Sequence, residues 1–370
     1  MGKCQLCGTH HPLISDKLGV CLNCIHDKPK EALRITDKVH ERTRRVFGLP
    51  PKPPQDPNGL LCGICANNCR IDVGGKGFCA LVSNVDGKLV RIGGTPDKGV
   101  LEWYYDPLPT NCVARWFCPG CTGAGYPRYA NEKGPEIGYS NLAVFYGACS
   151  YDCLFCQNWH HRHMVSSSRP TMSAQDLAEK ANSRVSCICF FGGDPSPQMP
   201  HALKTSQLAM QEAERDNRIL RICWETNGYE KQEFALSAAE LSLKNGGNLK
   251  FDLKAWSEDV NQALCGVSNK PTLRTFKLIG ERFFDKRPEL PILTASTLLV
   301  PGYVEAEEVS RLSAFIARIN PEIPYTLLAF CPQYVMDDLP TTSRKQANQC
   351  YEAARKHLNH VRIGNVNLLS

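Results

Sequence analysis

Residues 142–156 read LAVFYGACSYDCLFC, an apolar run followed at once by three cysteines in the spacing CxxxCxxC. The run has the length of a buried strand, and Cys149, Cys153 and Cys156 follow it within one tight loop. Three thiolates on such a loop can reach three corners of an iron–sulfur cube, which leaves the fourth iron open to another molecule. The alternative is a zinc site completed by a histidine of HHRH, residues 160–163. The spacing and the position after a strand favour the cluster.

The rest of the C-terminal part alternates between apolar and amphipathic stretches. From residue 139 onward each apolar run is followed by a segment of helical character, and Ser173 with Asp176 has the pattern of a helix N-terminus. Repeated strand and helix predict an α/β fold with a parallel sheet, either a barrel or an open sheet. The predicted strands are residues 142–146, 185–191, 219–225, 249–253, 292–300, 325–330 and 361–366.

Cysteine is the unusual residue of this chain, which has 20 of them. The start, MGKCQLCGTH, lacks the apolar core of a signal peptide, so we expect a cytoplasmic protein. In a reducing compartment such a density of cysteine favours metal and cluster ligation over disulfides. Two CxxC pairs, Cys4 with Cys7 and Cys21 with Cys24, predict a four-thiolate structural metal site.

A second group of four cysteines has the pattern CxxCxxxC followed by GFC. This spacing suits one iron or zinc ion, or a second cluster, and we expect a single tetrahedral ion because structural sites have four protein ligands and no open position. Its members are Cys62, Cys65, Cys69 and Cys79. The remaining cysteines are Cys112, Cys118 and Cys121, which are assigned no role, and Cys187, Cys189, Cys223, Cys265, Cys331 and Cys350, which we expect to be small core residues.

Composition shifts divide the chain into four segments. Residues 1–30 form a four-cysteine metal knob, and residues 31–60 hold a helix and the proline-rich linker LPPKPPQDPNG. Residues 61–138 form a cysteine-rich loop region with a metal site, in which residues 88–92 alternate as a hairpin strand does. Residues 139–370 contain the alternating strands and helices.

Bulk composition excludes several classes of protein. Hydrophobic residues at 42% and charged residues at 22% are typical of a globular fold. The longest nearly apolar stretch, residues 290–300, is too short to cross a membrane. The formal charge is +6, but the basic residues are scattered, so we expect no nucleic acid partner and no membrane partner.

Five sets of residues follow one another along the chain: CSYDCLFCQNW at 149–159, GGD at 192–194, WETNGY at 224–229, FDLKAW at 251–256, and YTLLAFCPQY at 325–334 with RIGNV at 362–366. Together they resemble the radical S-adenosylmethionine (SAM) superfamily, on the branch of the glycyl-radical-enzyme activases. CGICANNC with GFC, residues 62–79, also resembles the N-terminal segment of that branch, so the likeness spans about residues 61–370.

The resemblance implies a partial (β/α)6 radical SAM barrel behind a cysteine-rich, metal-stapled N-terminal extension. It implies a [4Fe-4S] cluster on Cys149, Cys153 and Cys156 whose open iron binds the amino and carboxylate groups of SAM. The other implied SAM contacts are Gly192, Gly193 and Asp194, the last shorter than the family's usual Glu, and Thr226, Asn227, Asp252 and Lys254 at strand ends. Glu225, also at a strand end, is a candidate ribose contact or proton carrier.

A finer resemblance rests on the four-cysteine knob, on WFCPGCTGAGYPRY at 116–129 and on the short tail after RIGNV. These features are similar to the methanogenesis marker 10 family, cobalamin-dependent radical SAM methyltransferases that modify an arginine carbon of methyl-coenzyme M reductase. They imply cobalamin, the alpha subunit of that reductase as protein substrate, and an electron donor such as a ferredoxin or flavodoxin. They also imply a tyrosine oxygen on the fourth iron, for which Tyr104 and Tyr105 are the candidates; a strand-end packing pair is the alternative.

Three other hypotheses compete with this one. In the first, the chain is an activase that uses SAM without cobalamin. In the second, it is an iron–sulfur electron carrier or metal scaffold without catalysis. A zinc-ribbon nucleic-acid binder is the last, and it relies on residues 1–24 alone.

Overall fold

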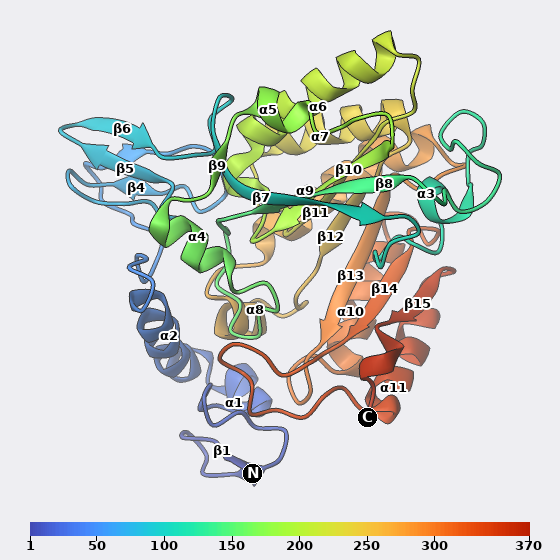
Figure 1. The fold of residues 1–370 in the computed structure, drawn as a ribbon. Helices are drawn as coiled ribbons and strands as arrows, with labels where there is room; N and C mark the ends of the chain where they lie inside the picture. Colours follow the sequence, from blue (N-terminus) through green and yellow to red (C-terminus); the bar gives the residue numbers. More distant parts are fainter.

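The computed structural model describes residues 1–370 and is built around one large sheet (Figure 1). The strands of this sheet are β7 (Gly99–Pro107), β8 (Ser140–Tyr146), β9 (Thr171–Met172), β10 (Val185–Gly192), β11 (Arg221–Thr226), β12 (Leu249–Asp252), β13 (Leu293–Leu299), β14 (Tyr325–Ala329) and β15 (Val361–Gly364). Their order is β15-β14-β13-β12-β11-β10-β8-β7-β9. Pairing is parallel from β8 through β15, and β7 pairs antiparallel with β8 and β9. All seven predicted strands are confirmed.

Six helices cover the outer side of the curved sheet: α5 (Ala174–Ala178), α6 (Met199–Arg215), α7 (Gln232–Asn245), α9 (Lys270–Phe283), α10 (Ala306–Ala317) and α11 (Arg344–Arg355). Helix α8 (Glu258–Cys265) packs against the N-terminal helices and the cysteine loop, and α4 (His161–Ser167) packs beside β7. The short 3-10 turns are η1 (Ser196–Gln198), η2 (Phe284–Lys286) and η3 (Val366–Leu368). The predicted start of α5 is confirmed, because the Ser173 hydroxyl accepts a hydrogen bond from the Asp176 amide at 3.0 Å. Since β15 and β9 are free edges, the sheet is an open, partial barrel of the predicted α/β class.

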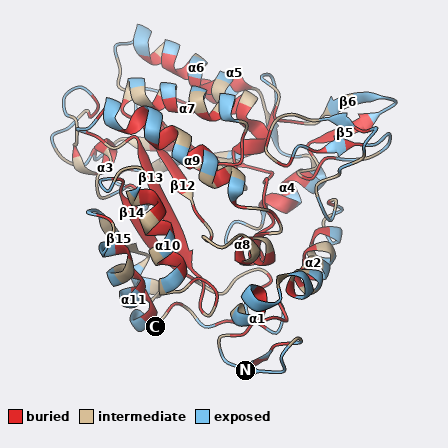
Figure 2. Cartoon of the chain, turned by 180° about the vertical axis from the view of Figure 1, so that it is seen from behind, coloured by how far each residue is buried: buried red, intermediate tan, exposed pale blue.

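The two faces of the sheet have different characters. One face packs on the helices in a core of 43 buried residues, in which Phe190 stacks on Trp224 with ring centroids 4.8 Å apart. Figure 2 shows the buried strands inside and the exposed outer faces of the helices. The other face carries polar side chains such as Glu225 and Lys250 into the interior of the barrel, where they line cavities. The alternation of strand side chains therefore separates the core from the site.

Strand β7 was not predicted. Its residues fall in the 61–138 segment, so the sheet contains residues on both sides of the 138/139 boundary. Only the first three of its nine residues are buried, as expected for a strand near the sheet edge. A strand with so few buried side chains gives little apolar alternation in the sequence.

The N-terminal part is built from small elements. They are β1 (Gly2–Lys3), β2 (His10–His11), α1 (Leu22–Asp27), α2 (Pro29–Arg45), β3 (Leu60–Leu61), β4 (Arg70–Ile71), β5 (Val82–Val85), β6 (Lys88–Arg91) and α3 (Pro119–Thr122). The predicted hairpin strand is confirmed, because β6 pairs antiparallel with β5. Helix α2 starts at Pro29, which suits a first helical position, and buries Ala32, Thr36, Val39 and His40 on one face. None of the helices has both the length and the apolar character that crossing a bilayer requires.

Candidate active site

One open cavity of about 220 Å³ lies where the carboxyl ends of the parallel strands meet the cysteine loop. Every cysteine predicted for the cluster and every residue predicted to contact SAM lines it: Cys149, Cys153, Cys156, Gly192, Gly193, Asp194, Glu225, Thr226, Asn227, Asp252 and Lys254. These residues come from four separate stretches of the sequence. The site thus assembles at the sheet edge where ligands of parallel α/β folds bind.

The cysteine loop is held by backbone hydrogen bonds to the end of α8. The amides of Asp152 and Leu154 donate to the carbonyls of Cys265 and Leu264, both at 2.9 Å. The Cys149 sulfur accepts from the Tyr151 amide at 3.3 Å and from the Asn227 side-chain amide at 3.5 Å. Donors aimed at sulfur favour its thiolate form, which is the form that binds iron.

The spread of the three sulfurs suits a cluster better than one ion. Four thiolates around zinc, at about 2.3 Å each, place their sulfurs about 3.8 Å apart. In this structure the only group of three or more ligand atoms that lie within 4.8 Å of one another is the N-terminal cysteine set. Cys149, Cys153 and Cys156 therefore line the cavity without converging on a single point.

Two glycines at the end of β10 allow the close approach of the loop. Gly192 has φ 108°, and a Cβ on it would lie 2.5 Å from the Tyr146 nitrogen. A Cβ on Gly193 would lie 2.2 Å from the Ala148 oxygen, directly before Cys149. Any larger residue would push the cysteine loop away from β10, so the glycines fix the shape of the cavity.

Asp194 joins three parts of the site. Its carboxylate accepts hydrogen bonds from the Ser150 hydroxyl at 2.8 Å, the Thr226 hydroxyl at 3.1 Å and the Asn227 amide at 3.0 Å. Burial raises the pKa of Asp194, while these hydrogen bonds favour its charged form. Because the protein itself engages both oxygens, the geometry supports a positioning role, and a direct contact with SAM stays a prediction.

Asp194→Asn is expected to raise the KM for SAM about tenfold, because an amide nitrogen would face groups that are themselves donors. The measurement is the SAM dependence of 5′-deoxyadenosine formation. Asp216→Asn, on the surface, is the matched control and is expected to leave KM unchanged. An unchanged KM for SAM in Asp194→Asn would contradict the positioning role of Asp194.

Three buried polar atoms of residues that line the cavity lack a partner in the chain. They are Nδ1 of His161, Nε of Arg162 and Oδ1 of Asp252. The other Asp252 oxygen pairs with Lys254, and although burial opposes the charge, Asp252 and Cys153 raise the pKa of Lys254 above its usual value. Buried polar atoms need a partner, so this wall fits a polar, zwitterionic ligand such as SAM. His161, one of the histidines that could complete a zinc site, lines the cavity and is buried.

Beneath the loop lies a buried charge network centred on Asp152. The carboxylate contacts His40 at 2.8 Å, Arg162 at 2.9 Å and Arg44 at 3.4 Å. Although burial opposes its charge, His40 and the two arginines hold the pKa of Asp152 well below its usual range. No local pattern predicted this network, because His40 and Arg44 come from α2, more than a hundred residues away from Asp152.

A second cavity continues the first toward the interior of the barrel. The two share Phe191, Glu225 and Lys250. Tyr104 lines only the second cavity, and its ring packs edge-on against Phe191 at 6.5 Å. Tyr105 points to the opposite face of β7, where its hydroxyl donates to the Lys180 carbonyl at 2.9 Å. Neither tyrosine lines the cluster cavity, and Tyr105 faces away from both cavities.

Lys250 is a site residue that the sequence analysis missed. Its ammonium lies 3.1 Å from Glu225, 3.1 Å from the Cys189 sulfur and 3.3 Å from the Cys112 sulfur. The signal was present, because Lys250, Asp252 and Lys254 alternate along β12 and the loop after it and so point to one face. Cys189, expected in the core, lines the second cavity instead.

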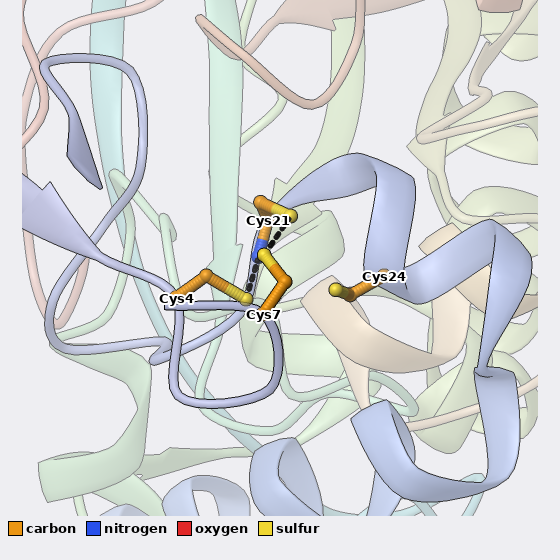
Figure 3. Close-up of side chains that lie close together, drawn as sticks. All are labelled: Cys4, Cys7, Cys21 and Cys24. Carbon is orange, nitrogen blue, oxygen red and sulfur yellow. Dashed lines mark hydrogen bonds between the residues drawn. The ribbon is translucent and has the colours of Figure 1, made fainter. Parts of the chain in front are cut away.

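The N-terminal cysteines form a compact metal-binding geometry (Figure 3). The sulfurs of Cys4, Cys7, Cys21 and Cys24 lie within 4.8 Å of one another. The Cys4 sulfur accepts from the Cys21 amide at 3.4 Å, and hydrogen bonds from Thr9 lower the pKa of Cys7 to about 6. Four thiol ligands at this spacing fit one tetrahedral ion.

Cys4→Ser is expected to lose about one equivalent of bound metal and to lower the melting temperature, because metal binding and folding are coupled in such knobs. Metal analysis and thermal unfolding measure the two effects. Cys331→Ser, outside every cysteine group, should change neither. Full metal content in Cys4→Ser would contradict the assignment.

Three comparisons show which known proteins the chain is similar to. Residues 143–312 match the family model of the radical SAM superfamily. An uncharacterised protein of Methanocaldococcus jannaschii is 25% identical over 319 residues, which cover 84% of this chain and 83% of that protein. The fold also resembles SuiB of Streptococcus suis bound to S-adenosylmethionine (TM-score 0.43, 13% identity, 62% of this chain, about half of SuiB at 51%). A domain of pyruvate-formate lyase-activating enzyme from Bacteroides vulgatus gives a TM-score of 0.37 at 19% identity, over 48% of this chain and 98% of that one. The residues that match the radical SAM family model contain the cysteine loop and strands β10 to β13.

Proposed function

We propose that this chain cleaves SAM reductively and uses the product radical to remove a hydrogen atom from a carbon of a protein substrate. The observation that carries the proposal is the convergence of the three loop cysteines with the ends of β10, β11 and β12 on one cavity. When bound, the cluster and SAM supply one electron and a 5′-deoxyadenosyl radical. All other requirements of the reaction have to be met by the chain's own residues.

Those residues position and enclose the reactants. Tyr151 and Asn227 donate to the Cys149 sulfur, and Asp194 fixes the cysteine loop against β11. Asp252 and His161 offer the unpartnered polar atoms that a zwitterion requires. The second cavity extends from this site beyond Phe191 toward the interior of the barrel, next to where a substrate carbon would have to lie.

The finer part of the proposal is methylation of an arginine carbon in the alpha subunit of methyl-coenzyme M reductase, with cobalamin as methyl carrier and a ferredoxin or flavodoxin as electron donor. Its support is the motif resemblance alone. The residues that line the two cavities do not identify a cobalamin site.

The experiment is anaerobic turnover with SAM carrying a labelled methyl group, a strong reductant, methylcobalamin and a peptide from the reductase. The proposal predicts 5′-deoxyadenosine, and its finer part predicts a label on an arginine carbon. If a glycyl radical formed on a partner protein without cobalamin, arginine methylation would be contradicted and the activase function would be supported. Absence of 5′-deoxyadenosine from cluster-loaded protein would contradict the proposal as a whole.

A further inference from the structure

The second cysteine group surrounds a small cavity of its own. Cys62, Cys65, Cys69 and Cys79 all line it, together with Phe78 and Arg91. Cys65 and Cys69 are buried, whereas Cys62 and Cys79 are partly exposed. The fold therefore brings four thiols from the two hairpins β3–β4 and β5–β6 and their connections to one place near the surface.

The spread of these four sulfurs differs from that of the N-terminal knob. No three of them lie within 4.8 Å of one another, whereas all four knob sulfurs do. A single tetrahedral ion holds its sulfurs about 3.8 Å apart, so the knob has the spacing of one ion and this group does not. The sulfurs of Cys149, Cys153 and Cys156 also lie farther apart than those of the knob, and their implied ligand is an iron–sulfur cube. The single ion expected from the sequence is thus the poorer fit.

Cationic and amide donors surround the sulfurs. Arg91 donates from Nη1 to the Cys62 sulfur at 3.3 Å, and its buried Nε has no partner in the chain. The Phe78 amide donates to the Cys69 sulfur at 3.4 Å. An iron–sulfur cluster with four thiolates is anionic, and hydrogen bonds to its sulfurs stabilise the reduced form. The donor set therefore suits a redox cluster.

Two short connections join this group to the cysteine loop of the active site. In the first, the Asn67 side chain, between Cys65 and Cys69, donates to the Ser150 carbonyl at 2.8 Å, next to Cys149. In the second, the Arg44 guanidinium donates to the Phe78 carbonyl, next to Cys79, and lies 3.4 Å from Asp152, next to Cys153. Both connections are buried, so the two cysteine groups are rigid neighbours.

We propose that Cys62, Cys65, Cys69 and Cys79 hold a second iron–sulfur cluster with no open iron, and that it passes electrons to the active-site cluster. This role rests on the proposed function and extends it. A one-electron carrier protein is oxidised as it reduces the second cluster, which is reoxidised as it reduces the cluster of Cys149, Cys153 and Cys156. Four protein ligands exclude SAM from the second cluster, and its partly exposed edge at Cys62 receives the electron.

The first test uses the variant Cys149→Ala/Cys153→Ala/Cys156→Ala, in which the second group is left intact. After anaerobic reconstitution it is expected to keep about four acid-labile sulfides per chain. Sulfide is the readout because the knob metal contributes none. A variant with one metal ion at the second group and no sulfide would overturn the proposal, and it would leave the proposed function standing.

The second test separates electron transfer from a structural role. In Cys62→Ala, SAM cleavage driven by reduced flavodoxin is expected to fall at least about tenfold, while cleavage driven by dithionite falls less than about twofold, because a small reductant reaches the active-site cluster directly. Cys331→Ser is the matched control and should match the wild type with both reductants. An equal loss with both reductants, or no loss with either, would overturn the electron-transfer role.

Discussion

Alanine at Cys149, Cys153 and Cys156 together is expected to abolish reductive SAM cleavage. The rate of 5′-deoxyadenosine formation should fall by about a thousandfold or more, the scale seen when groups that carry the chemistry are removed. The reason is that the three sulfurs are the only thiols that line the cavity at the strand ends. Chromatographic measurement of 5′-deoxyadenosine after anaerobic turnover gives the rate.

Two comparisons make this result informative. Cys331→Ser carries the same kind of substitution outside every cysteine group and should keep full activity. Far-ultraviolet circular dichroism should show that the triple variant keeps its helices, since the loop lies outside the main core. A triple variant that still cleaves SAM at the rate of the wild type would contradict the assignment of the cluster.

The second large effect is expected at Asp152, where Asp152→Ala should lower the free energy of unfolding by about 3–5 kcal/mol, because two buried guanidinium groups lose their only carboxylate. The melting temperature should fall by about 10 °C. Asp216→Ala is the control, since Asp216 is exposed and its ion pair with Arg218 is worth at most about 1 kcal/mol.

The pH dependence of this difference follows from the pKa of Asp152. That pKa is lowered in the folded state, because His40 and the two arginines outweigh the effect of burial. The carboxylate therefore stabilises the fold fully above its unfolded pKa of about 3.9, and this stabilisation is lost as the pH falls further. The gap between the wild type and Asp152→Ala should be constant from pH 8 to pH 5 and shrink below about pH 4. A gap that grew on acidification would contradict the charge network.

The sequence predicted the parts of the fold that depend on local pattern. Strands such as β10 and β13 are buried along nearly their whole length, which gives them clear apolar runs. The candidate SAM contacts were proposed because they follow directly on such runs. The knob was predictable because CxxC pairs alone define a tetrahedral site. In the same way, the CxxxCxxC spacing placed the loop before any tertiary contact was known.

What the sequence did not predict depends on tertiary contacts. His40 and Arg44 reach Asp152 from α2, and no local pattern links residues so distant in the chain. The spread of sulfurs that separates the knob from the second cysteine group is likewise a property of folded loops, because both groups have CxxC spacing. Lys250 is the exception, since the alternation along β12 already placed it beside Asp252.

The most direct test of the central claim is electron paramagnetic resonance of the anaerobically reduced protein with and without SAM. We expect the reduced protein to show the signal of a [4Fe-4S] cluster, and we expect its g values to shift when SAM is added, because SAM binds the iron that the three cysteines leave open. A reduced protein that shows no cluster signal assignable to Cys149, Cys153 and Cys156, or a signal that SAM leaves unchanged, would contradict it.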